Sequence, residues 1–125
     1  MHDHLNHWLV FDASESDDGV LTLEAMASVA PPHLPQAWAA VQEALARAYR
    51  TATSPPHPLE QGGEWDMLLQ VQCDDAPPFT MPWEATVGGA GPPELNGQVR
   101  WVALTLTLVA SESLAGLMQD SLPQS

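Results

Sequence analysis

The chain has 125 residues, of which 16 are acidic and three are basic, so its formal net charge at pH 7 is −13. The basic residues are Arg47, Arg50 and Arg100, and there is no lysine. Such a chain could not neutralise a row of phosphates, which argues against direct nucleic-acid binding. The same deficit argues against binding to an anionic membrane surface. Schiff-base chemistry is excluded because it requires a lysine.

The length suits one domain that folds without a disulfide or a metal ion, and Cys73 is the only cysteine. The N-terminus lacks the basic start and apolar centre of a signal peptide. No apolar run approaches the roughly 20 residues of a membrane span. We therefore expect a cytoplasmic protein without membrane association. A single domain is expected over residues 8–122, between a histidine-rich tail at 1–7 and a short tail at 123–125.

The histidines of the first segment, His2, His4 and His7, are spaced closely enough to suggest metal binding. No cysteine pair follows them, so the spacing matches no closed zinc site. We predict no metal site and no cofactor.

A β-hairpin is predicted at the start of the domain. Residues 8–13 (WLVFDA) form the first strand candidate, and residues 14–19 (SESDDG) have turn composition. Residues 20–30 alternate with period two, although LEAMAS within them also suits a helix.

An amphipathic helix is predicted after the prolines at 31, 32 and 35. Over residues 34–50, apolar side chains recur at spacings of three and four, namely Leu34, Trp38, Val41, Leu45, Ala48 and Tyr49. Glu43 can pair with Arg47. Arg47 and Arg50 could form an anion site, but we interpret them as charges that favour the end of the helix.

A loop is expected over residues 51–63, and a third strand over residues 64–73, with Cys73 as a small core residue. Residues 74–98 are rich in proline and glycine, which is unusual for a connection within a compact domain. Residues 79–87 could add an edge strand. Alternatively, the segment folds over a pocket or presents Phe79 and Trp83 to a partner.

The longest β-type run is residues 99–110. Val102, Leu104, Leu106 and Leu108 fall on one face, which must be covered. Trp101, Ala103, Thr105, Thr107 and Val109 fall on the other face, which is suited to partial exposure. A short helix follows over residues 111–122, with an apolar stripe of Leu114, Leu117, Met118 and Leu122.

The order β-β-α-β-(β)-β-α predicts an α+β two-layer sandwich, in which a mainly antiparallel sheet of four or five strands carries two helices on one face. The uncovered face would carry some apolar side chains. A homodimer through that face or through a sheet edge is expected by a small margin over a monomer.

No catalytic motif is present, and no histidine falls within a predicted helix or strand, which lowers the odds of an enzyme without excluding one. We predict a small acidic, non-catalytic protein-binding or regulatory protein with a basic partner. The predicted contact residues are Asp12, Glu15, Asp17, Asp18, Glu24, Asp66, Phe79, Trp83 and Trp101. Mimicry of nucleic acid would require the six acids to share one surface. The alternative is a small-molecule-binding protein or enzyme, with a pocket under residues 74–98 lined by Trp65, Trp83, Trp101 and Met81.

Overall fold

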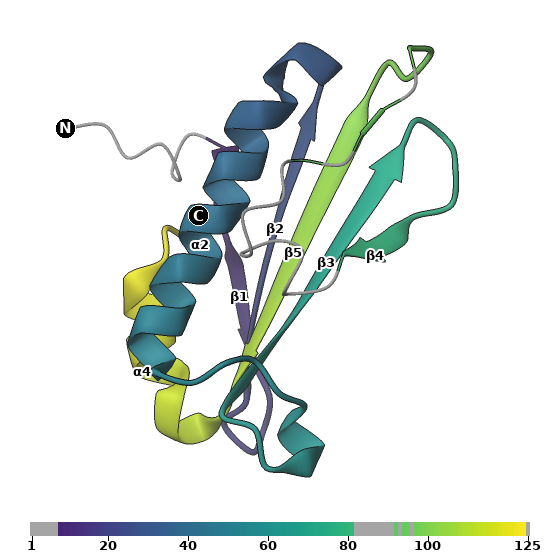
Figure 1. Cartoon of the computed structure of the whole chain (residues 1–125). Coiled ribbons are helices and arrows are strands. Elements are labelled where there is room, and N and C mark those ends of the chain that lie inside the picture. Colours follow the sequence, from purple (N-terminus) through teal and green to yellow (C-terminus); the bar gives the residue numbers. More distant parts are fainter. Residues whose placement is uncertain (1–7, 82–91, 93, 96, 125) are drawn as a thin grey trace, which may run out of the picture.

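The computed structural model describes residues 8–81, 92, 94–95 and 97–124. Its elements in chain order are β1 (Asp12–Glu15), β2 (Leu21–Val29), η1 (Pro31–His33), α2 (Leu34–Ala52), η2 (Leu59–Gln61), β3 (Trp65–Cys73), β4 (Phe79–Met81), β5 (Val102–Ala110) and α4 (Glu112–Ser121). The strands form one antiparallel five-stranded sheet in the order β1-β2-β5-β3-β4. Both helices lie on one face of this sheet, so the predicted α+β sandwich is confirmed (Figure 1).

The core lies between the helices and the covered face of the three long strands. β5 pairs over all its nine residues with both β2 and β3. Val102, Leu104 and Leu106 are completely buried, as the alternation of apolar residues predicts. Each buried leucine side chain contributes about 2 kcal/mol of transfer free energy, so this face supplies much of the drive to fold.

The helices bury narrower stripes than the sequence suggests. Leu45, Ala48 and Ala52 of α2 face the core, whereas Tyr49 lies at the margin of the stripe and is 43% exposed. In α4 the buried residues are Leu114 and Met118, and Leu117 is 61% exposed. Tyr49 and Leu117, which belong to the apolar stripes of the sequence, therefore lie at the margins of the buried surface.

The first strand begins later than predicted. The pairing of β1 with β2 ends at Asp12, and residues 8–11 are not part of the strand. Leu9 and Phe11 are completely buried. The Phe11 N–H donates to Pro123 O at 2.9 Å, and Phe11 forms a parallel bridge with Gln124, so this segment contributes to the core and pairs with C-terminal residues that were expected to be a tail.

The predicted edge strand at 79–87 is present as β4 over Phe79–Met81, and residues 82–87 lie outside the described residues. The loop before β3 is fixed by a core side chain, since Trp65 Nε1 donates to Ser54 O at 2.7 Å. In the part of the chain that the structure describes, neither helix has the length and apolarity needed to cross a membrane.

Candidate functional site

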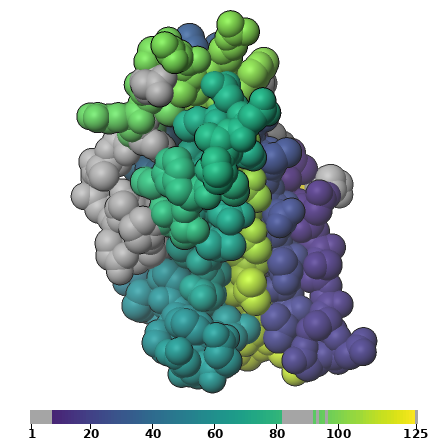
Figure 2. Space-filling model, turned by 90° about the vertical axis from the view of Figure 1, so that its right-hand side faces the viewer, coloured from purple at the N-terminus to yellow at the C-terminus, as the bar shows by residue number. Residues whose placement is uncertain are grey.

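The sheet face opposite the helices, here called the open face, is the broadest candidate surface. Its rows are set by strand register. One row joins Asp12, Glu24, Thr107 and Leu68, and the next joins Met26, Thr105, Gln70 and Thr80. Figure 2 views this side of the molecule, where β5 forms a narrow strip between β3 and β2. The strip is narrow because the open-face residues of β5 are small, namely Ala103, Thr105, Thr107 and Val109.

Large apolar side chains stand on either side of this strip. Met26 is 64% exposed on β2, and Leu68 is 41% exposed on β3. Trp101 lies immediately before β5 and points to the same face as Ala103 and Thr105. It is 55% exposed. The open face therefore combines a flat centre of small side chains with three accessible apolar groups, a pattern typical of contact surfaces.

The strand residues of the open face include three carboxylates and no Arg, Lys or His. Asp12 and Glu24 are directly opposite each other on β1 and β2, and Asp66 lies on β3 one row further along. Asp66 is separated from β2 by β5, which places it about 10 Å away at two interstrand spacings. Glu24 Oε2 accepts a hydrogen bond from Thr107 Oγ1 at 3.4 Å. The charge of this face is purely negative.

The other three predicted acids are placed elsewhere. Glu15 is opposite Leu21, so it belongs to the helix side of β1. Asp17 and Asp18 form the turn between β1 and β2. The six acids do not share one face, so the condition set for mimicry of nucleic acid is not met.

Asp18 has a local structural role in this turn. Its carboxylate accepts a hydrogen bond from the Ser16 hydroxyl, which lowers its pKa below the ordinary value of 3.8, and a hydrogen bond with the Val20 backbone adds to this effect. Gly19, with φ of 84°, donates its N–H to Ser16 O at 3.0 Å. The pair Asp18 and Gly19 therefore closes the hairpin.

The predicted aromatic contact residues are also separated. Phe79 is opposite Val71 on β3, which gives it the orientation of the covered face, and it is 45% exposed at the sheet edge. Trp83 lies outside the described residues. Of the two predicted aromatics that the structure describes, Trp101 continues the open-face alternation and Phe79 does not.

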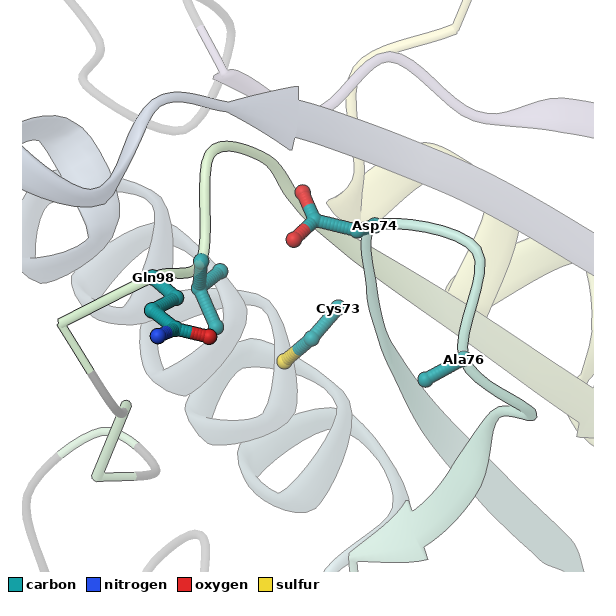
Figure 3. A pocket seen from close by; sticks show the side chains of 5 residues that line it. Cys73, Asp74, Ala76 and Gln98 are labelled. Atoms are coloured by element: carbon teal, nitrogen blue, oxygen red, sulfur yellow. The ribbon is translucent and has the colours of Figure 1, made fainter.

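A second candidate is a cavity of about 280 Å³ at the end of the sheet where β3 stops and β5 starts. It is lined by Cys73, Asp74, Ala76, Gln98 and Val99. Figure 3 shows the Asp74 carboxylate turned toward the segment that leads into β5. Asp74 Oδ1 accepts the backbone N–H of Arg100 at 3.0 Å and that of Trp101 at 2.9 Å. Asp74 thus holds the start of β5 in place.

Trp83 lies outside the described residues, and the other three residues predicted to line a pocket do not line this cavity. Trp65 is completely buried in the core, and Met81 packs against the core from β4. Trp101 is on the surface rather than in the cavity. The strand register directs the side chains of Trp65 and Met81 to the covered face of the sheet. This explains the difference, because side chains that fill the core cannot also face a ligand.

A third candidate lies at the end of α2, where Arg47, Arg50, Thr51 and Ser121 line a cavity of about 220 Å³. Arg47 Nε is 3.1 Å from Glu43 Oε1, and Arg50 Nη2 is 3.6 Å from the same oxygen. Both arginines therefore share one carboxylate, which agrees with the predicted Glu43–Arg47 pair and reduces the positive field that an anion would meet.

Within the described residues, no three His, Cys, Asp or Glu side chains converge in a way that could hold a metal ion. The histidines at positions 2, 4 and 7 lie outside the described residues. No protein-family model, no curated protein and no solved structure matches this chain. The function must therefore be argued from the surface itself.

Proposed function

We propose that this chain is a non-catalytic protein-binding or regulatory protein that uses the open face to bind a basic partner. The observation that carries the proposal is the composition of this face. It combines exposed apolar groups at Met26, Leu68 and Trp101 with carboxylates, and its strand residues include no base.

The charge of the whole chain supports a basic partner. A net charge of −13 creates a long-range field that speeds the approach of a basic surface and repels an acidic one. Glu24 and Asp66 lie on the two sides of the β5 strip, so a cationic side chain that reached the strip would meet a carboxylate on either side. Contact with the small residues of β5 requires no large side chain to move.

The apolar groups would supply the part of the affinity that is insensitive to salt. Burying a methionine, leucine or tryptophan side chain at an interface stabilises the complex by about 1–3 kcal/mol, before the cost of ordering is subtracted. The proposal therefore predicts a complex whose association rate depends on salt and whose dissociation rate depends on Met26, Leu68 and Trp101.

The test begins with capture of partners from the native cell lysate at low salt, followed by elution at moderate salt and identification. The purified partner is then titrated with the wild-type chain and with the double variant Glu24→Gln/Asp66→Asn. These changes keep the shape and one acceptor oxygen in each side chain but remove two charges. We expect affinity at low salt to fall by about tenfold and the salt dependence to become weaker.

The matched control is Glu60→Gln/Asp120→Asn, which removes two exposed charges from η2 and α4. This variant should change the affinity by less than about threefold, because its charges are not on the open face. Equal losses for the two double variants would mean that only net charge matters. No basic partner at low salt would contradict the proposal.

A second candidate function, binding of a small molecule between the sheet and residues 74–98, has one observation in its favour. The cavity of about 280 Å³ beside Cys73 is close in size to small ligand sites. A thermal-shift screen against metabolites tests it. A hit should be lost in Ala76→Trp, which would fill the cavity, and should persist in Glu24→Gln/Asp66→Asn.

A further inference from the structure

The outer edge of β2 is paired over only part of its length. β2 runs from Leu21 to Val29 and pairs with β5 through all nine residues. On its other side, β1 pairs only with the segment from Leu21 to Glu24. Among the described residues, no strand is in register with the rest of this edge, from Ala25 to Val29.

The register identifies which backbone groups face this gap. The Ser16 N–H donates to Val20 O at 2.9 Å, so residues 16 and 20 form a hydrogen-bonded pair of the hairpin. Hydrogen-bonded pairs alternate along an antiparallel ladder. The N–H and C=O groups of Met26 and Ser28 therefore point away from β5, whereas those of Ala25, Ala27 and Val29 point toward it.

The chain itself leaves this edge vacant in the described structure. Continuation of β1 would place Val10 opposite Met26, but the pairing of β1 with β2 ends at Asp12 and Glu24. Met26 is 64% exposed, and Ser28 is exposed as well. Two donors and two acceptors of the sheet are thus available at one accessible stretch.

The opposite side of the sheet is protected at equivalent positions of β3. The His57 N–H donates to Trp65 O at 2.9 Å, and the Met67 N–H donates to the Asp66 carboxylate at 2.8 Å. Leu69 and Val71 pair with β4. Proteins usually cover their sheet edges in such ways, because an uncovered edge is a template for another strand. Within the part of the chain that the structure describes, no such contact covers Met26 and Ser28 on the β2 edge.

We propose that the outer edge of β2 at Met26 and Ser28 is a strand-addition site for an extended, basic segment of a partner protein. The basic character of the segment rests on the proposed function, whereas the edge geometry does not. Main-chain hydrogen bonds would supply affinity, and side chains that alternate on the two sides would supply specificity. The segment would extend the line of β1 along the sheet.

Charge and length define this occupant. The carboxylates of Asp12 and Glu24 lie at the end of the vacant stretch, where β1 stops. A lysine or arginine at the matching end of the added segment would meet both. The five residues of the gap span about 17 Å, so a segment of six or seven residues suffices. A second copy of this chain would bring another 13 negative charges, which opposes pairing of two β2 edges.

The first test uses the unmodified protein. Amide hydrogen exchange by NMR should be fast at Met26 and Ser28 and slow at Ala25 and Ala27, because only the latter amides are bonded to β5. Slow exchange at Met26 and Ser28 in the free protein would overturn the proposal, since it would mean that the chain already covers this edge.

The second test uses a defined probe, a seven-residue peptide that alternates valine and lysine, with a glutamate-for-lysine peptide and an N-methylated lysine peptide as controls. Only the unmethylated basic peptide should slow exchange at Met26 and Ser28, by at least about tenfold at saturation. Binding of this peptide without that protection would overturn the proposal.

Proline variants distinguish binding at the outer edge of β2 from binding at the open face. Met26→Pro removes an outward N–H without breaking the pairing of β2 with β5, and proline is tolerated at such edge positions. Thr80→Pro is the matched control on β4, because its neighbours Phe79 and Met81 make the hydrogen bonds to β3. Met26→Thr keeps the N–H and removes the apolar side chain. We expect Met26→Pro to bind the peptide at least tenfold more weakly than Met26→Thr, because both lack the methionine side chain and only the proline lacks the N–H, and we expect less than a threefold change for Thr80→Pro.

The outcomes distinguish the two proposals. If Glu24→Gln/Asp66→Asn loses the identified partner while Met26→Pro binds it as well as Met26→Thr does, the proposed function stands and strand addition is wrong. If Met26→Pro binds the partner at least tenfold more weakly than Met26→Thr while the double variant keeps it, strand addition stands and charge recognition is wrong. Sedimentation of the protein alone completes the test. A dimer that Met26→Pro dissociates would make the occupant a second copy and overturn the proposal of a basic segment.

Discussion

The two faces of β5 have the same backbone and opposite environments. On the covered face, Leu104 and Leu106 are completely buried beneath the helices. On the open face, Thr105 and Thr107 are only half-buried and are flanked by side chains of β2 and β3. The covered face therefore stabilises the fold, whereas side chains on the open face can be substituted with little loss of stability. A surface of this second kind is where binding can be built.

The largest effect that separates the two faces should come from neighbouring substitutions on one strand. Leu106→Ala removes a completely buried side chain and should lower the free energy of unfolding by about 3 kcal/mol. Thr105→Ala, one residue away, should lower it by less than about 1 kcal/mol, because it loses mainly strand propensity. Urea denaturation followed by circular dichroism measures both. Similar losses would mean that the open face is covered in solution.

A smaller effect should come from the acids of the open face. Asp12 and Glu24 are directly opposite each other, and like charges in that position repel. Glu24→Gln should therefore raise the free energy of unfolding by about 0.3 kcal/mol at low salt. The gain should disappear in 0.5 M salt, where exposed charges are screened. Glu60→Gln serves as the control and should show no gain. A loss of stability in Glu24→Gln would mean that the charge of Glu24 stabilises its hydrogen bond with Thr107 by more than it repels Asp12.

The smallest effect concerns Asp18 in the turn between β1 and β2, whose carboxylate stabilises the fold of the free protein. The hydrogen bond from Ser16 lowers the pKa of Asp18, so its contribution is complete above the ordinary value of 3.8 and is lost as pH falls through the lowered pKa of the folded protein. Asp18→Asn should be slightly less stable than the wild type at pH 7, and the difference should shrink as the pH falls below 3.8 and vanish below the lowered pKa of the folded protein. Urea midpoints at several pH values test this, with Asp17→Asn as the control. A difference that persists at low pH would assign the effect to turn geometry.

The long elements were predictable because their patterns are strong. Period-two alternation located β2, β3 and β5 to within one or two residues, except that residues 99–101 precede β5. Spacing of three and four located α2 and α4. The open face followed from the same alternation, since the residues between the buried leucines of β5 must point the other way. Trp101 was identified as a contact residue on this basis.

The remaining candidate residues were less predictable because their positions depend on pairing. Asp12 and Glu24 share a row only because of the hairpin register. Glu15 lies an odd number of positions from Asp12, so its side chain takes the opposite side of β1. The edge at Met26 and Ser28 was not anticipated. The one available signal was the apolar character of residues 8–11, which reads equally well as a strand or as a segment that fills the core.

The sequence by itself determined the fold class, the strongly negative charge and the face of each long strand, because these depend on composition and local periodicity. The tertiary structure alone decided which strands are neighbours, where β1 ends and which backbone groups stay unpaired among the described residues. Those features depend on contacts between distant segments, such as the hydrogen bond from Phe11 to Pro123. Local patterns cannot encode such contacts, because they join segments from opposite ends of the chain that meet only when the core forms.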